Sequence, residues 1–178
     1  LQRLQLEQVV EIHKNRGAFV AAPTPELAEQ ILLARHTIEL AVVKLACQRC
    51  TVADVQQLQK MIDLEQSAID QGDMATALRR SGEFHLQLAI VAGNQPFVHA
   101  LRGLISQTSL IITMYSHGGG NACARDEHSQ LLEAVKLGDE QQGQELMAHH
   151  LGHIAQGCDF NQSPQVANVK GAFAHLNS

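Results

Sequence analysis

The stretch GEFHLQLAIVAGNQP at residues 82–96 decides the fold, because it contains the end of one helix and the start of the next. Phe84 and Leu88 have the four-residue spacing of a single helical face. Gly93 suits the left-handed position that follows a helix, and Pro96 suits the first turn of a new one. The stretch therefore predicts two helices joined by a short turn, which favours antiparallel neighbours.

The same combination of apolar repeats and capping residues extends to both sides of this stretch. Thr24, Thr51, Asp73 and Asp139 each precede an apolar repeat, and their short polar side chains can cap the first turn of a helix. The chain contains only 4 prolines, so long uninterrupted helices are possible. The sequence therefore predicts an all-α fold, an antiparallel bundle of six to seven helices. The expected helices cover roughly residues 25–49, 52–70, 74–92, 96–116, 124–137 and 140–157.

Residues 1–22 differ from the rest of the chain. They begin with the pattern of a helix end, and the runs VVEIH at 9–13 and AFVAA at 18–22 are short and β-like. This pattern predicts a β-hairpin with Lys14 and Arg16 at its tip. The apolar residues of the hairpin have too little partner sequence to become buried, so the segment is expected to be a fragment of a larger unit.

Composition limits the function of this chain. Its 178 residues fit one domain, and only 3% of them are aromatic, so a core of Leu, Ile, Val and Ala is expected. A formal net charge of -5 argues against a body that binds nucleic acid, since such a body is usually basic. No apolar run approaches the roughly 18 residues of a membrane span, and no signal peptide is visible. We therefore expect a cytoplasmic protein without a membrane partner.

The cysteines do not have the pattern of a disulfide framework in a chain of this size. Cys47 and Cys50 form a lone C-x-x-C, which is a weak signal for a metal or redox site. We expect reduced thiols with a structural role, and metal or redox use is the alternative.

Three histidines stand at equivalent places in three separate helical patterns. His85, His128 and His150 are each surrounded by apolar residues at helical spacing. Side chains on facing helices of a bundle project inward and can build a shared site, and imidazole suits Zn, Ni, Cu or Fe. A single buried histidine is more often a hydrogen-bonded core residue. The three together therefore leave a metal site, a metal-free polar pocket and an ordinary core as alternatives.

Five motifs in order resemble the GntR superfamily of bacterial transcription regulators, in its FadR-like branch with an FCD effector domain. They are NRGAFVA at 15–21, R-x-x-x-E at Arg35 and Glu39, EFHLQLAIVAGN at 83–94, EH-x-x-LLEAV-x-x-GD at 127–139, and HL at 150–151. The resemblance covers about residues 1–158. It implies a remnant of a winged-helix DNA-binding domain at 1–22, an effector-binding bundle at 23–158 and a C-terminal tail at 159–178. Most of the DNA reader would then lie upstream of Leu1.

The resemblance also implies a set of site residues. Family members with a metal site use three histidines, which match the three above, and an Asp four residues before the first. Ser81 stands at that position, so we expect the affinity for a divalent transition metal, Zn or Ni, to be weakened. The Ser81 hydroxyl can instead bind a water or a bound acid. Arg35 resembles the family arginine that reaches the pocket and would pair with an effector carboxylate, with Glu39 as its structural partner.

The function implied by the resemblance is ligand-responsive regulation of transcription. A small carboxylate effector would bind the bundle of a homodimer and change its binding to operator DNA, with Lys14 and Arg16 as DNA contacts. The apolar run LIITMY at 110–115 is expected to be central or at the dimer contact. We expect no enzyme, although a metal-dependent hydrolase with a His-rich centre is an alternative. Against it, Glu83 adjoins His85 in sequence and points elsewhere on the helix. A helical dimerisation module without a ligand is the third possibility.

Overall fold

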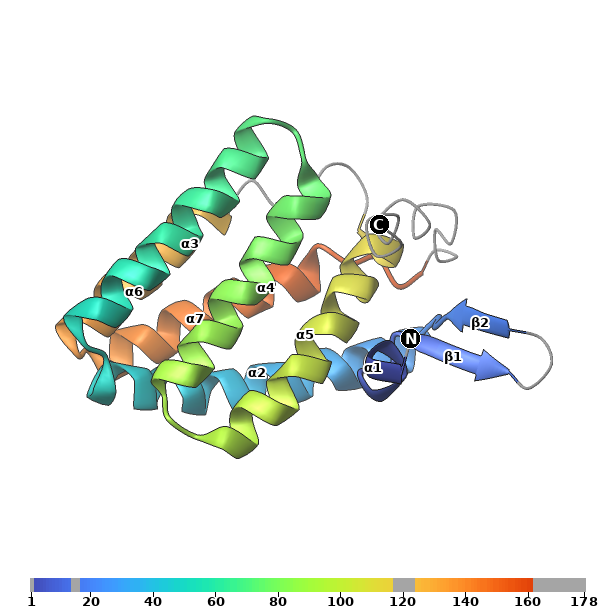
Figure 1. Ribbon diagram of the computed structural model, residues 1–178, viewed down its shortest axis with the longest axis horizontal. Helices are drawn as coiled ribbons and strands as arrows, with labels where there is room; N and C mark the ends of the chain where they lie inside the picture. Colours follow the sequence, from blue (N-terminus) through green and yellow to red (C-terminus); the bar gives the residue numbers. More distant parts are fainter. Residues whose placement is uncertain (1, 14–16, 117–123, 162–178) are drawn as a thin grey trace.

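The bundle predicted from the sequence is confirmed by the computed structural model, which describes residues 2–13, 17–116 and 124–161 (Figure 1). Each predicted helix end lies within one residue of the observed end. The elements are α1 (Gln2–Leu6), β1 (Val10–His13), β2 (Gly17–Val20), α2 (Pro25–Arg49), α3 (Val52–Asp70), α4 (Met74–Val91), α5 (Gln95–Tyr115), α6 (Ala124–Leu137) and α7 (Glu140–Gln156).

Local side-chain chemistry explains why the helices begin and end where they do. The Thr51 side chain accepts a hydrogen bond from the backbone of Asp54, and the Asp54 carboxylate accepts one from the backbone of Thr51. This reciprocal capping box stabilises the start of α3 by about 1 kcal/mol. The Asn94 side chain caps α5 by accepting a hydrogen bond from the backbone of Phe97, and Gly93 before it has a φ of 65°, which favours glycine. The turn between α4 and α5 therefore follows from its sequence.

Helix α2 is the central element of the bundle, since it lies against α4, α5, α6 and α7, whereas α3 packs on α4 and α6. The core between these helices is mainly aliphatic, as the composition predicted, and Phe84 is its fully buried phenylalanine. Its most deeply buried members include Val42, Val43, Ala46, Leu58, Phe84, Leu88, Leu101, Leu131, Val135 and Met147. Among the described residues, no helix has the length and apolar character needed to cross a membrane.

The apolar run at 110–115 is buried within the chain except for the half-buried Ile112 and Thr113. Leu110, Ile111, Met114 and Tyr115 are fully buried in a second core cluster, and the Tyr115 hydroxyl donates to the backbone carbonyl of Pro23 at 2.7 Å. Of the two expectations for this run, the central position is correct. Its buried side chains are not available to a second copy of the chain.

The hairpin of β1 and β2 projects from the end of the bundle where α2 begins (Figure 1). Several contacts attach its base: Val9 is buried in the second core cluster, and the Ser106 hydroxyl of α5 donates to the Glu7 carboxylate at 2.6 Å. Beyond the base, Ile12 and Phe19 are exposed, as expected of a segment with few partners. Lys14 and Arg16 lie outside the described residues.

The described cysteines are free thiols. The Cys47 thiol donates to the backbone carbonyl of Asp139 at 3.5 Å, and burial raises its pKa to about 11. Burial also raises the pKa of Cys158 to about 11. Because the reactive form of a cysteine is the thiolate, these thiols are poor nucleophiles at neutral pH and fit the structural role expected of them.

Two helical glycines test the packing of the bundle. A Cβ added at Gly82 of α4 would lie 2.8 Å from Ile105 Cγ2 on α5, whereas one added at Gly152 of α7 would meet nothing within 4 Å. We expect Gly82→Ala to lower the free energy of unfolding by about 1–3 kcal/mol through overpacking. Gly152→Ala, the matched control, should raise it by up to about 1 kcal/mol through helix propensity. Urea unfolding measures both, and equal stability of the two variants would contradict the α4–α5 contact.

Candidate metal centre

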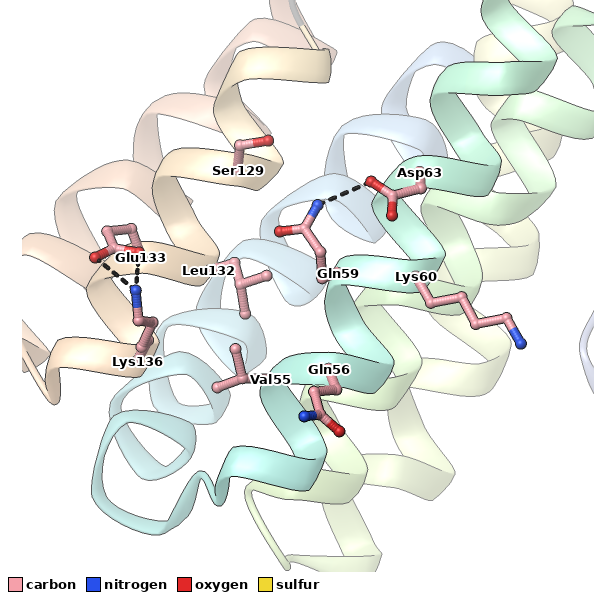
Figure 2. A pocket seen from close by; sticks show the side chains of 9 residues that line it. All are labelled: Val55, Gln56, Gln59, Lys60, Asp63, Ser129, Leu132, Glu133 and Lys136. Atoms are coloured by element: carbon pink, nitrogen blue, oxygen red, sulfur yellow. Dashed lines mark hydrogen bonds and ion pairs between the residues drawn. The ribbon is translucent and has the colours of Figure 1, made fainter.

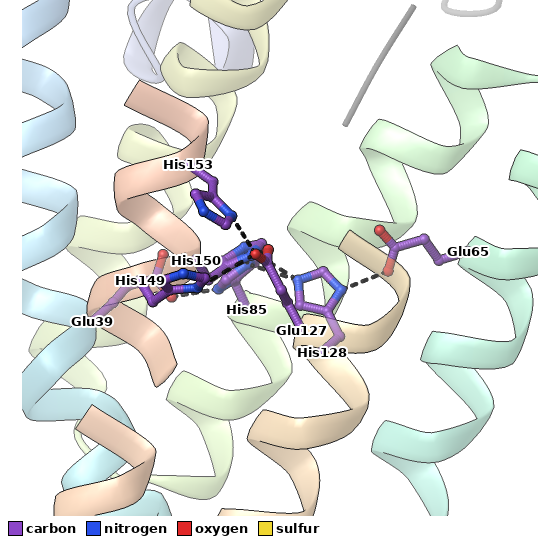
Figure 3. A network of polar contacts seen from close by, with 8 residues as sticks. All are labelled: Glu39, Glu65, His85, Glu127, His128, His149, His150 and His153. Atoms are coloured by element: carbon purple, nitrogen blue, oxygen red, sulfur yellow. Dashed lines mark hydrogen bonds and ion pairs between the residues drawn. The ribbon is translucent and has the colours of Figure 1, made fainter. Parts of the chain in front are cut away.

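Three histidine rings converge at the centre of the bundle (Figure 3). His85 comes from α4, His128 from α6 and His150 from α7, and all three are buried. The Nε2 atom of His85 lies 3.1 Å from that of His150 and 3.3 Å from that of His128. The Nε2 atoms of His128 and His150 are 3.3 Å apart. These three nitrogen atoms therefore face one shared point.

Helical periodicity explains why the rings point inward. On α7, His150 lies between Met147 and Ile154 at spacings of three and four residues, and all three are buried. On α6, the His128 ring packs against Phe84 of α4, with ring centroids 4.5 Å apart. Each histidine thus occupies a core position of its helix.

A glutamate binds the outer nitrogen of each ring. The Nδ1 atoms contact Glu39 of α2 at 2.5 Å, Glu65 of α3 at 2.8 Å and Glu127 of α6 at 2.8 Å, in the order His85, His128 and His150. An Nδ1–H that donates to a carboxylate leaves the Nε2 lone pair as the acceptor, which is the tautomer of a metal ligand. The hydrogen-bond pattern therefore assigns all three inward nitrogens as lone-pair donors.

The distances between the inward nitrogens fit a metal ion. Two nitrogen ligands at a Zn–N distance of about 2.0–2.1 Å and a tetrahedral angle are about 3.3–3.4 Å apart. Three lone pairs held at 3.1–3.3 Å repel one another, and a cation among them removes that repulsion. This histidine triad can therefore hold a divalent transition metal and leave a position for water or an acid.

The electrostatics of the site keep His85 and His150 neutral and Glu39 and Glu127 charged. Burial lowers the pKa of His85 to about 4 and that of His150 to about 3, so both are unprotonated at neutral pH. Burial alone would raise the pKa of Glu39, but His85 and the Arg35 guanidinium outweigh it and hold that pKa at about 2. The hydrogen bond from His150 lowers the pKa of Glu127. Neutral imidazoles are the form that binds metal.

The two residues expected to bind an effector, Arg35 and Ser81, lie on helices α2 and α4. Arg35 is buried on α2, and its Nε donates to Glu39 Oε1 at 2.6 Å, while the other Glu39 oxygen binds His85. Arg35 is thus joined to the triad through one carboxylate. Ser81 is half-buried on α4, one helical turn before His85.

Several residues of this network were not singled out from the sequence. Glu39 was expected only as a partner of Arg35, and Glu65 was not identified at all. The signal for Glu65 was present, because it shares the apolar stripe of α3 with Leu58 and Ile62, where a carboxylate needs a partner. Glu127 appeared only within a motif, and its contact with His150 was not foreseen.

A surface groove of about 370 Å³ lies between α3 and α6, apart from the triad (Figure 2). It contains neither a triad histidine nor one of the three glutamates. The buried Leu132 and the half-buried Val55 contribute its apolar part, and the other lining side chains are exposed and polar. They are Gln56, Gln59, Lys60, Asp63, Ser129, Glu133 and Lys136. This groove is therefore separate from the histidine triad.

Comparison with known proteins gives one family and one fold. Residues 30–153 match the family described as the FCD domain. No curated protein is similar enough in sequence to match. The solved structure of McbR/YncC from E. coli is 19% identical with a TM-score of 0.68, and the alignment covers 87% of this chain and 81% of that one. GntR from Streptococcus agalactiae is 18% identical with a TM-score of 0.64, covering 87% of this chain and 78% of that one. At these identities the structures show a shared fold.

Metal content tests the triad directly. We expect the untagged protein to retain one tightly bound zinc per chain after dialysis, and His128→Ala to lose it, because two imidazoles hold the ion too weakly. Zinc at 100 times its Kd should stabilise the fold by about 2.7 kcal/mol, and a chelator should reverse this effect. Elemental analysis and thermal unfolding measure the two effects. His99→Ala, which changes an exposed histidine of α5, is the control. Unchanged zinc content in His128→Ala would exclude the triad as the site.

The carboxylates should tune the metal affinity without touching the ion. We expect Glu65→Gln to weaken zinc binding about 10- to 100-fold, because the neutral amide does not raise the basicity of His128 and can donate as well as accept at Nδ1. Glu133→Gln, which changes an exposed residue of α6, should leave the affinity unchanged. Competition with a chromophoric chelator measures both constants. Equal constants for the two variants would show that Glu65 has no part in metal binding.

Proposed function

The chain belongs to the FCD domain family, and we propose that its helical bundle is the effector-binding domain of a bacterial transcription regulator. In this proposal the triad holds a divalent metal, Zn or Ni, and a small organic acid binds beside it. The observation that carries the proposal is the set of three inward Nε2 atoms, each backed by its own glutamate. A bound metal would supply a Lewis-acidic position for an oxygen of the acid.

The chain itself offers groups that suit a carboxylate. The guanidinium of Arg35 uses its Nε for Glu39, and its other N–H donors match the geometry of a carboxylate. Ser81 adds a hydroxyl one turn before His85. Because Ser81 brings no negative charge, it favours an anionic guest where an Asp would repel one.

Helix α2 connects the proposed acid site to the proposed DNA reader. It carries Arg35 and Glu39 in its middle, and its first residue, Pro25, follows the hairpin segment. In the proposed protein, residues 1–22 belong to the DNA reader, 23–158 sense the acid, and 159–178 are a tail. Lys14 and Arg16 contact operator DNA, and two chains form a homodimer. Regulation then requires the acid to bind one arrangement of the readers more tightly than the other.

The neighbouring carboxylates favour binding over catalysis. Glu39, Glu65 and Glu127 each bind a ring Nδ1, so they orient imidazoles and are poorly placed to take a proton from water. Glu83 pairs with Arg79 and Arg80 on the outside of α4. Regulation therefore accounts for the described acidic residues better than hydrolysis does.

Calorimetric titration with a panel of mono-, di- and tricarboxylic acids tests the proposal. We expect at least one acid to bind the zinc-loaded protein, and to bind the metal-stripped protein at least about tenfold more weakly, since a metal–oxygen contact is lost. Arg35→Lys keeps the charge beside Glu39 but loses the planar fork, so it should weaken the same acid about tenfold. Arg79→Gln, which changes an exposed residue of α4, is the control. An absence of heat with every acid in both states would refute acid sensing.

A further inference from the structure

A second cluster of metal-ligand residues lies beside the buried triad (Figure 3). His149 and His153 stand one helical turn apart on α7, and their ring centroids are 4.0 Å apart. The Nδ1 of His149 lies 3.6 Å from Glu127 Oε1, and the Nδ1 of His153 bonds to the same oxygen. One ligand atom from each of the three residues lies within 4.8 Å of the others. The proposed function uses neither of these two histidines.

The cluster is open to solvent, unlike the triad. The side chain of His149 is 63% exposed and that of His153 is 34% exposed, whereas the side chain of Glu127 is 13% exposed. Glu127 belongs to both groups, since its Oε2 accepts from the buried His150 and its Oε1 faces the two outer rings. One carboxylate of α6 therefore joins the buried centre to the surface.

We propose that His149, His153 and Glu127 form a second metal site, a surface site for a divalent transition ion such as Zn²⁺, Ni²⁺ or Cu²⁺. Two histidines at positions i and i+4 of one helix present their rings to the same point, as zinc-binding helices do. A carboxylate from a facing helix completes a set of two imidazoles and one oxygen, with the remaining positions open to water. A neutral imidazole can carry its proton on Nε2 and offer Nδ1 to the ion.

The two sites should differ in affinity. At the triad, three imidazoles are already ordered by glutamates and packing, so little ordering is needed when the ion binds. At the surface site, the exposed ring of His149 must be ordered first, and Glu127 already shares its charge with His150. We therefore expect the surface site to bind zinc at least about tenfold more weakly than the triad.

Zinc stoichiometry separates the two sites. The full untagged chain, stripped of metal, is titrated with zinc in the presence of a chromophoric chelator. Two equivalents with unequal affinities are expected for the wild type. His149→Ala and His153→Ala should each keep the tight equivalent and lose the weak one, while His128→Ala should lose the tight equivalent and keep the weak one. His99→Ala is the matched control, as an exposed histidine elsewhere on the surface.

Two outcomes would overturn the second site. The first is a single equivalent of zinc in the wild type, and the second is a weak equivalent that persists when both His149 and His153 are replaced. Because both side chains are at least partly exposed, circular dichroism of the metal-stripped variants should show unchanged folding. Loss of the tight equivalent in His128→Ala reports on the triad alone, so failure of the proposed function is distinguishable from failure of this inference.

Discussion

Buried pairing between histidine and glutamate is the constraint on which the centre of this bundle depends. An unpaired buried charge costs several kcal/mol, so each glutamate needs its histidine partner. Each pair therefore fixes the position of one helix relative to another. Five helices meet in this network, and α5 alone among the long helices does not contribute a pair. The pairs are His85–Glu39 between α4 and α2, His128–Glu65 between α6 and α3, and His150–Glu127 between α7 and α6.

The network links the proposed sensor to helix α2, which follows the hairpin. Helix α2 has 25 residues and is about 37 Å long, so it runs from the hairpin past the triad. Glu39 binds Arg35 on the same helix and His85 on α4, so a guest that moves either partner acts on α2. Helix α2 begins at Pro25, two residues after Pro23, whose carbonyl accepts a hydrogen bond from the Tyr115 hydroxyl. Helix α2 is therefore the element through which the proposed acid site could act on residues 1–22.

Much of this architecture could be predicted from the sequence, because the relevant signals are local. Thr51 and Asp54 determine a helix start within four residues, and Gly93 determines a helix end by its backbone freedom alone. Periodicity also indicated the inner face for His85. The partners of the rings were harder to foresee, since Glu65 and His128 are 63 residues apart and periodicity gives the face of a helix without its neighbour. For the same reason the sequence allowed either a central position or a dimer contact for the run at 110–115. Its packing in one core cluster with Val9 is visible only in the structure.

The three glutamates around the rings change the expected role of Ser81. A carboxylate at that position would bring a fourth negative charge to a centre that already has Glu39, Glu65 and Glu127 around its rings. With serine there, a bound divalent ion would have only neutral imidazoles as direct protein ligands, and it would keep more of its charge for an incoming anion. The glutamates raise the basicity of the rings and so offset part of the lost metal affinity. Serine at this position therefore favours the binding of an acid through the metal in the proposed site.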